Sequence, residues 1–361
     1  MSGLTVTDLH KSFDTHPVLT GVDLDVPPGS FTAILGQSGS GKTTLLRLLA
    51  GFDPPDRGSV MIGEKLVESN AIHVKPEHRR IGYVPQEGAL FPHLTISGNV
   101  GFGLRRAARR AEVGELLDLV GLGDVAGRYP HQLSGGQQQR VAVARALAVK
   151  PEVVLMDEPF AALDASLRAS VRDDVRGILR RASTTAILVT HDQDEALSIA
   201  DLVAVLRDGR IAQCGTPQEV YTRPVDDDLA QFLGDANLLA GTFDGELVAT
   251  ALGRLPAQWH TEPIPTPCPV TILIRPEAIQ VGMAGARGAS GRITRVEYHG
   301  HDAMVHVEID GALLIVRSSG DAGLAPGAEV TLTTRGPTLI WPSTAAAATA
   351  QGRQSGPPRA P

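Results

Sequence analysis

The stretch Gly36–Thr43 reads GQSGSGKT and fits the pattern G-x-x-x-x-G-K-[ST]. Its glycines permit a tight loop whose backbone N–H groups converge on phosphate oxygens, and its lysine reaches the outer phosphates of a nucleotide. The Thr43 hydroxyl can bind Mg²⁺, and the helix that begins there points its positive end at the same anion. The phosphate-binding residues that we expect are Gly36, Ser38, Gly39, Ser40, Gly41, Lys42, Thr43 and Thr44.

The loop lies between a predicted strand and a predicted helix. Phe31–Leu35 is short and mostly apolar, which suits a buried central strand, and Thr43–Ala50 is predicted as a helix. A plain Gly/Ser turn before a helix is the alternative, but the strand–loop–helix context favours a nucleotide loop. Two more apolar strands, Val153–Met156 and Ala186–Thr190, each precede a polar turn and a helical pattern. Strands that alternate with helices predict a wound, parallel α/β sheet.

Two carboxylates follow the strand Val153–Met156. Because the carboxyl ends of parallel strands form the ligand-binding edge of an open sheet, we expect Asp157 beside the phosphate loop. Asp157 would hold Mg²⁺ through water, and Glu158 would polarise the attacking water as a general base. The alternative is an ordinary strand that ends in a solvated acidic turn.

The composition of the chain changes near Asp235. Residues 90–150 look mostly helical, whereas from Asp235 to about Pro342 short β-like runs recur, punctuated by Gly and Pro. This pattern predicts a separate small all-β domain, either a sandwich or a barrel. Residues 343–361 contain no large apolar residue, which predicts a disordered tail.

Length, charge and cysteine content narrow the class of protein. A chain of 361 residues suggests two or three domains, and a net charge of −7 argues against a bulk nucleic-acid binder. Two distant cysteines, Cys214 and Cys268, exclude a disulfide framework and fit a reducing compartment. No apolar run approaches the roughly 20 residues of a membrane span, and Met1–Thr5 lacks signal-peptide features. We expect a soluble, cytosolic chain, unless a membrane-embedded partner recruits it.

The stretch Leu133–Arg140, LSGGQQQR, matches the signature motif of ABC ATPases. Ser134 and the two glycines open a helix, so that free N–H groups and a hydroxyl form a second anion cradle. In that family the second cradle belongs to another copy, and two copies stack head to tail around two ATP molecules. The resemblance therefore implies that Ser134, Gly135 and Gly136 contact ATP held by a second copy.

Four further positions resemble motifs of the same family, in the same order. Gln86 resembles the Q-loop glutamine, which senses the γ-phosphate and Mg²⁺, and Asp164 resembles the aspartate of the D-loop. Ala161 stands where serine is common in the family, and its side chain has no hydroxyl to contact a second copy. His191 resembles the switch histidine; its alternative is a plain histidine at a helix N-terminus. Phe13 resembles the aromatic residue that stacks on adenine, where tyrosine is commoner, and its alternative is a core position.

The resemblance covers nearly the whole chain. Residues 1–235 resemble an ABC ATPase domain, which implies an α/β P-loop NTPase with a RecA-like core, a β-subdomain and a helical subdomain at about 87–150. Residues 236–342 resemble the TOBE-type, OB-like region of importer ATPases, with a regulatory or dimerisation role. Val84–Leu94 and Gly300–Asp302 are most similar to the ferric-iron type. The polyamine, sulfate, thiamine and sugar types share most of this pattern, so these substrates remain alternatives.

The resemblance also implies the chemistry and the partners. The cofactors are ATP and Mg²⁺; the partners are a second copy, integral-membrane permease subunits and, indirectly, a solute-binding protein, with no nucleic acid. The protein is then peripheral, at the cytoplasmic face of the cell membrane. The implied catalytic residues are Glu158, His191 and Gln86, and the implied magnesium ligands are Thr43, Gln86 and Asp157.

Two other classes of function fit the sequence less well. A soluble ABC ATPase of the DNA-repair type needs a long coiled coil between the phosphate loop and the signature motif, but the interval from Gly36 to Ser134 shows no heptads. A translation-type member carries two cassettes, and this chain has one. A non-enzymatic ligand sensor is disfavoured because both Glu158 and His191 are present.

Overall fold

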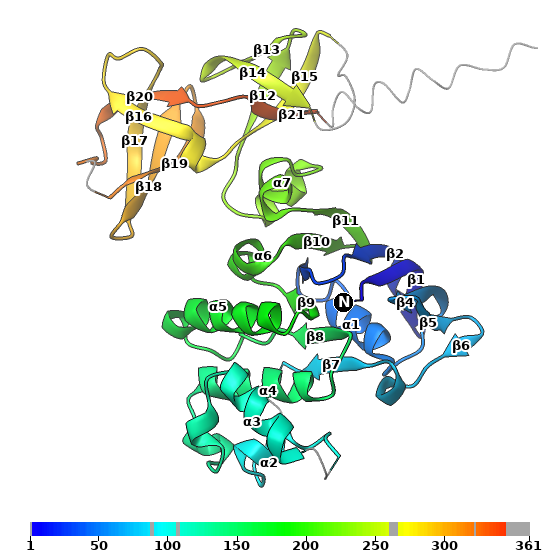
Figure 1. Ribbon diagram of the computed structural model, residues 1–361. Helices are drawn as coiled ribbons and strands as arrows, with labels where there is room; N and C mark the ends of the chain where they lie inside the picture. The colour runs from blue at the N-terminus through cyan, green and yellow to red at the C-terminus, as the bar shows by residue number, and fades with distance from the viewer. Residues whose placement is uncertain (1, 87–89, 106–108, 260–265, 321–322, 344–361) are drawn as a thin grey trace, which may run out of the picture. The chain divides into compact units, whose positions relative to one another are not determined.

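A computed structural model describes residues 2–86, 90–105, 109–259, 266–320 and 323–343 (Figure 1). The chain forms two compact units, Met1–Val220 and Tyr221–Pro361. The predicted tail falls outside the described residues except for Ser343, as do residues 87–89 of the segment that resembles the ferric-iron type. The domain boundary at residue 235 and the limits of the helical subdomain stay predictions.

The first unit is built on a six-stranded sheet. Its strands, in spatial order, are β11 (Arg210–Gly215), β10 (Leu202–Arg207), β3 (Phe31–Leu35), β9 (Thr185–Thr190), β8 (Val153–Asp157) and β7 (Ile81–Val84). All neighbours are parallel except β11, which pairs antiparallel with β10. Every residue of β3, β8 and β9 is buried, because both faces of the sheet are covered. The predicted wound α/β sheet is confirmed.

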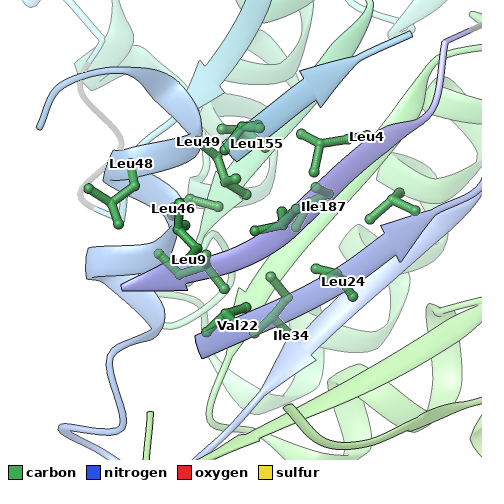
Figure 2. Packing of buried hydrophobic residues seen from close by; sticks show 14 of the residues in the cluster. Leu4, Leu9, Val22, Leu24, Ile34, Leu46, Leu48, Leu49, Leu155 and Ile187 are labelled. Carbon is green, nitrogen blue, oxygen red and sulfur yellow. The ribbon is translucent and has the colours of Figure 1, made fainter. Parts of the chain in front are cut away.

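A second sheet packs over the first helix of this unit. Its strands, in spatial order, are β2 (His16–Val26), β1 (Leu4–Phe13), β4 (Arg57–Ile62), β5 (Lys65–Ser69) and β6 (Ile72–His73). Figure 2 shows Leu46 and Leu49 of α1 (Lys42–Ala50) beside Leu9 of β1 and Leu155 of β8, with Leu4 of β1 near Ile187 of β9. All of these side chains belong to one buried cluster. Helix α1, which begins at the phosphate loop, thus shares one buried cluster with strands of both sheets.

Helices cover the remaining faces of the first unit. They are α2 (Ile96–Val100), α3 (Arg109–Leu119), α4 (Gly135–Ala148), α5 (Ala165–Arg181), α6 (Gln193–Ile199) and α7 (Pro217–Thr222), with 3₁₀ turns η1 (Pro76–His78), η2 (Gly123–Val125) and η3 (Pro130–Gln132). Helices α2, α3 and α4 pack on one another and form the predicted helical stretch (Figure 1). Across the described part of the chain, every helix is too short or too polar to span a bilayer.

A buried arginine fixes the far end of α1. The Arg79 guanidinium is fully buried and donates to the carbonyls of Leu48 and Leu49 at distances of 2.9 and 3.1 Å. It also pairs with the buried carboxylate of Glu68. The last carbonyls of a helix have no partner within the helix, so Arg79 satisfies two of them and adds a charge that suits the helix C-terminus. The C-terminal end of α1 is thereby fixed.

The second unit is almost entirely β, after the short helix α8 (Asp227–Phe232). A closed barrel contains β12 (Asn237–Phe243), β13 (Leu247–Thr250), β14 (Gly253–Trp259), β21 (Thr338–Pro342) and β15 (Cys268–Ile274). The 3₁₀ turn η4 (Pro276–Ala278) precedes a five-stranded sheet of β16 (Ile279–Met283), β20 (Glu329–Thr334), β17 (Ala289–Tyr298), β18 (Asp302–Ile309) and β19 (Ala312–Ser319). One hydrophobic cluster contains residues of both parts. The predicted all-β domain is confirmed, and it combines a barrel with a second sheet.

Replacing Asn237 with alanine should lower the free energy of unfolding of this unit by about 2 kcal/mol. Asn237 is 4% exposed and joins β12 to β19, since its amide donates to the Ile315 carbonyl and accepts from the Ile315 N–H, both at 2.7 Å. Urea unfolding can be followed by the fluorescence of Trp259 and Trp341, the only two tryptophans, which both lie in this unit. Gln280→Ala, at an exposed position, is the control and should change stability by less than about 0.5 kcal/mol. An unchanged midpoint for Asn237→Ala would contradict the structural role of this pair.

Candidate nucleotide-binding site

The phosphate loop connects the buried strand β3 to helix α1. A Cβ on Gly36 would lie 2.5 Å from the carbonyl oxygen of Leu206, and a Cβ on Gly41 would lie 2.9 Å from the Leu19 side chain. Gly41 also has a φ of 100°, a left-handed conformation that glycine adopts at no steric cost. Close packing and backbone conformation therefore require glycine at both positions.

Lys42 folds back over its own loop. Its side chain is 5% exposed, and its Nζ donates to the carbonyls of Gly36 and Gln37, both at 2.9 Å. Burial lowers the pKa of Lys42, and the nearby charges of Glu158 and Asp157 oppose that shift. The loop thus concentrates a positive charge beside its backbone N–H groups, which suits an anion.

Ser40 gives an independent sign that the loop fits a phosphate. Its hydroxyl oxygen is buried, and among the described residues it has no hydrogen-bond partner. A buried hydroxyl left unpaired costs about 1–3 kcal/mol. Around the Cα of Gly39 the space for a Cβ is open, so nothing from the described protein fills this part of the loop. A phosphate oxygen would satisfy the Ser40 hydroxyl.

Asp157 ends strand β8 beside the start of helix α1. The hydroxyl of Thr43 donates to Oδ1 of Asp157 at 3.3 Å, and the hydroxyl of Tyr83 lies 3.4 Å from Oδ2. Burial raises the pKa of Asp157, and the hydrogen bond from Thr43 opposes this shift. Burial also raises the pKa of Tyr83 to about 12, so the phenol stays protonated and donates. A hydroxyl and a carboxylate oxygen this close are the hard donors that Mg²⁺ prefers, so the donor set fits that ion.

Glu158 lies at the meeting point of three strand ends. Its Oε2 is 3.0 Å from Nδ1 of His191 and 3.5 Å from Nε2 of Gln86. These residues follow β8, β9 and β7, which are neighbours in the sheet. The backbone of Glu158 has a φ of 42°, and its N–H donates to the Val189 carbonyl at 2.9 Å. A left-handed glutamate is uncommon, and conformations of this kind cluster at functional sites.

Ser134 and its glycines lie at a helix N-terminus. Ser134 caps α4 through a reciprocal pair: its Oγ accepts from the N–H of Gln137 at 3.4 Å, and its own N–H donates to Oε1 of Gln137 at 3.0 Å. Within the described residues, the Ser134 hydroxyl acts only as an acceptor. A Cβ on Gly136 would lie 2.6 Å from the Val171 side chain, so glycine lets α4 pack closely on α5. Among the described residues, no hydrogen bond joins this helix end to the phosphate loop.

Phe13 and Asp164 are both solvent-accessible. Phe13 ends strand β1 and is 48% exposed, so it is not a core residue. The ammonium of Lys11 lies 5.4 Å from the centroid of its ring, within the range of a cation–π contact. Asp164 occupies the N-cap position of α5, where its side chain makes no capping hydrogen bond.

Sequence reasoning missed two residues near this site. Tyr83 lies in β7, and no motif gives it a role, although its hydroxyl meets Asp157. Arg168 donates from α5 to Oδ2 of Asp192 at 3.2 Å. For Arg168 the available signal was spacing, because it lies four residues after Asp164 and so on the same helix face.

Comparison with known proteins agrees with the geometry. Residues 19–161 match the family model described as ABC transporter, and residues 272–336 match the TOBE domain. The Fe(3+) ions import ATP-binding protein FbpC 1 of Rhodococcus jostii (strain RHA1) is 47% identical over 349 residues, covering 94% of this chain and 99% of the relative. The FbpC protein of Serratia marcescens is 44% identical over 347 residues, covering 94% and 99%.

A solved structure is similar to the first part of the chain. It is the dimeric structure of a post-hydrolysis state of the ATP-binding cassette MJ0796 bound to ADP and Pi. It has a TM-score of 0.51 and 31% sequence identity, and it covers 59% of this chain and 98% of its own.

The phosphate loop, the buried sheet and the converging carboxylates define a P-loop ATPase. The chain belongs to the family of ATP-binding proteins of ABC transporters and carries a TOBE domain after its ATPase domain. The expected fold class, an ABC-type P-loop fold with a C-terminal all-β domain, and the expected enzyme class, an ATPase coupled to transport, are confirmed. The roles of the individual site residues stay predictions.

Proposed function

We propose that this protein is the ATP-hydrolysing subunit of a bacterial importer for ferric iron. The observation that carries the proposal is the extent of the similarity: relatives named Fe(3+) ions import ATP-binding proteins match 94% of the chain, including the β unit. An ATPase domain alone would leave the substrate class open, because many importers share it. The chain would work at the cytoplasmic face of the membrane, where permease subunits recruit it.

The site supports a mechanism of positioning and charge stabilisation. The loop N–H groups, Lys42 and Ser40 would hold the outer phosphates of ATP, and Phe13 would stack on the adenine. Glu158 would accept a proton from the attacking water. Its contact with His191 would hold the Glu158 carboxylate in position.

The donor set around Asp157 would serve the metal ion. Thr43, Asp157 and Gln86 would hold Mg²⁺, which neutralises charge on the phosphates when it is bound. Tyr83 donates to the carboxylate oxygen of Asp157 that Thr43 does not use, and so orients it.

A second copy of the chain would complete each site. Ser134 and Gly135 are exposed at the N-terminus of α4, where free N–H groups favour an anion, and Asp164 is exposed at the start of α5. In a head-to-tail dimer, these residues and Gly136 would contact the ATP held by the other copy. The MJ0796 structure is dimeric, which supports a second copy as the partner. ATP binding would close the dimer and hydrolysis would reopen it, and each state would favour a different permease orientation.

The substrate can be tested by reconstitution. The chain, its co-purified permease and the cognate binding protein are placed in liposomes with ATP, and uptake of radioactive ferric iron is compared with that of spermidine, sulfate, thiamine and maltose. We expect iron uptake, together with ATPase stimulation by the iron-loaded binding protein. Uptake of one of the other solutes without iron would overturn the ferric-iron assignment but leave the importer function in place. ATPase activity that no permease changes would contradict the importer function.

A further inference from the structure

A small cavity of about 100 Å³ lies beside the proposed general base, Glu158. Its lining includes Arg168 from α5, and His191 and Asp192 from the turn that follows β9. The chemistry proposed above gives Arg168 no part, yet this half-buried side chain contacts both segments that meet at the cavity.

The Arg168 guanidinium donates in two directions. Its Nη1 lies 3.2 Å from Oδ2 of Asp192, and its Nη2 lies 3.3 Å from the carbonyl oxygen of Leu163. Leu163 directly precedes Asp164, and Asp192 directly follows His191. A guanidinium presents its donors in a rigid, planar fork, so one arginine can fix the distance between two segments.

The turn that carries Asp192 is also held from within. The N–H of Asp192 donates to Oγ1 of Thr190 at 3.0 Å, and that hydroxyl donates to Oε2 of Glu195 at 2.6 Å. The N–H of Glu195 donates to Oδ1 of Asp192 at 3.0 Å, which caps helix α6. The two carboxylate oxygens of Asp192 therefore have separate partners: one caps α6 and the other accepts from Arg168. His191 lies in the chain between Thr190 and Asp192, which these hydrogen bonds connect.

We propose that Arg168 is a positioning residue for ATP hydrolysis. Through Asp192 it holds the turn from which Nδ1 of His191 meets Glu158 at 3.0 Å. Because the Asp192 N–H, side chain and helix cap form one rigid unit, a shift of its carboxylate moves the backbone of His191. The inference rests on the proposed function, since it assigns Arg168 a part in the same reaction.

The second donor of Arg168 extends this role to the neighbouring segment. By holding the Leu163 carbonyl, Arg168 ties the His191 turn to the residue before Asp164. A second copy that contacts Asp164 would therefore also act on the position of His191. This link lies within one chain and does not require contact between the two copies at His191 itself.

Substitution of Arg168 tests whether this residue affects the rate of ATP hydrolysis without affecting the affinity for ATP. Arg168→Ala should lower kcat for ATP about tenfold, because small misplacements at a reacting centre are costly, and should leave ATP affinity within about twofold. Arg180→Ala is the matched control: Arg180 lies on the same helix and makes an ion pair with Asp201 at 3.0 Å, at the end far from the site. Its kcat should be unchanged.

A double-mutant cycle tests the path through Asp192. Asp192→Asn keeps a helix-capping oxygen but removes the charge that accepts from Arg168, so it should also lower kcat about tenfold. Combining it with Arg168→Ala should cause no further loss, since both changes break the same contact. Backbone hydrogen exchange across residues 190–196 should be faster in both variants and unchanged in Arg180→Ala.

Several outcomes would overturn the inference. These are an unchanged kcat per folded molecule, losses that multiply in the double variant, or a change confined to the KM for ATP. If Arg168→Ala does not fold, Arg168→Lys, which keeps the charge but cannot reach both acceptors, must show the same fall in kcat. If the wild-type protein hydrolyses ATP and the Arg168→Ala variant has the same kcat, only this inference is overturned. Wild-type protein that neither binds nor hydrolyses ATP overturns the proposed function, and the inference with it.

Discussion

Replacing Glu158 with glutamine is expected to lower kcat for ATP hydrolysis about a thousandfold, a loss of about 4 kcal/mol in transition-state stabilisation. Glutamine has nearly the same shape as glutamate, and its amide can still meet Gln86 and His191, which lie 3.5 and 3.0 Å from the native carboxylate. An amide cannot accept the proton of the attacking water. ATP affinity should therefore stay within about threefold of the wild type, because the phosphate loop is untouched.

The measurements are phosphate release, the affinity for a fluorescent ATP analogue and light scattering. With ATP present and hydrolysis blocked, the Glu158→Gln variant should accumulate as a dimer. Glu152→Gln is the control, because Glu152 immediately precedes β8, at the opposite end of the strand from Glu158, and pairs with Arg80 away from the site. Its kcat should match the wild type. Undiminished phosphate release by the Glu158→Gln variant would refute the role assigned to that residue.

Three central strands of the six-stranded sheet, β3, β8 and β9, could be predicted because each carries its own signal. Phe31–Leu35 is a mostly apolar run and Val153–Met156 is a continuous one, and the structure buries every residue of β3 and β8. The end of each run also marks the carboxyl edge of the sheet, so Asp157 could be expected there before any contact was known. The signal for the helix start at Ser134 is also local in sequence, because the capping partner, Gln137, is three residues away.

The parts that sequence missed depend on contacts between distant segments. Tyr83 matters only because β7 lies beside β8, which puts its hydroxyl 3.4 Å from Asp157. Arg168 matters only because α5 runs past the turn after β9. No local pattern points to Asp157 as the partner of Tyr83 or to Asp192 as the partner of Arg168.

In the β unit, too, the arrangement of the strands depends on contacts between distant segments and could not be predicted from the sequence. Short β-like runs predicted that this unit contains strands, and one of those strands is β20. The pattern could not tell a barrel from a sandwich, because strand alternation reports only which face is buried. The partition into a closed barrel and a second sheet follows from strand pairing, such as that of β15 with the distant β21.

Replacing Lys42 with alanine is expected to weaken ATP binding about a hundredfold, or about 2.7 kcal/mol, the size of a lost charge-assisted phosphate contact. Burial lowers the pKa of Lys42, which means that the fold disfavours the charged form, so removing the ammonium should not reduce stability without ATP. The carbonyls of Gly36 and Gln37 lose their donor, but water can replace it at the open side of the loop.

The thermal shift caused by ATP separates the lost binding from any loss of folding. At an ATP concentration about 100 times the wild-type Kd, ATP stabilises the wild type by about 2.7 kcal/mol and a variant with hundredfold weaker affinity by only about 0.4 kcal/mol. The upward shift in Tm should therefore nearly vanish in Lys42→Ala, while its Tm without ATP stays at or above that of the wild type. Lys150→Ala is the control, since Lys150 is exposed and pairs with Glu112 at 3.0 Å, and it should keep the full shift. A full ATP shift in Lys42→Ala would mean that the loop binds phosphate through its backbone alone, against the role proposed for the lysine.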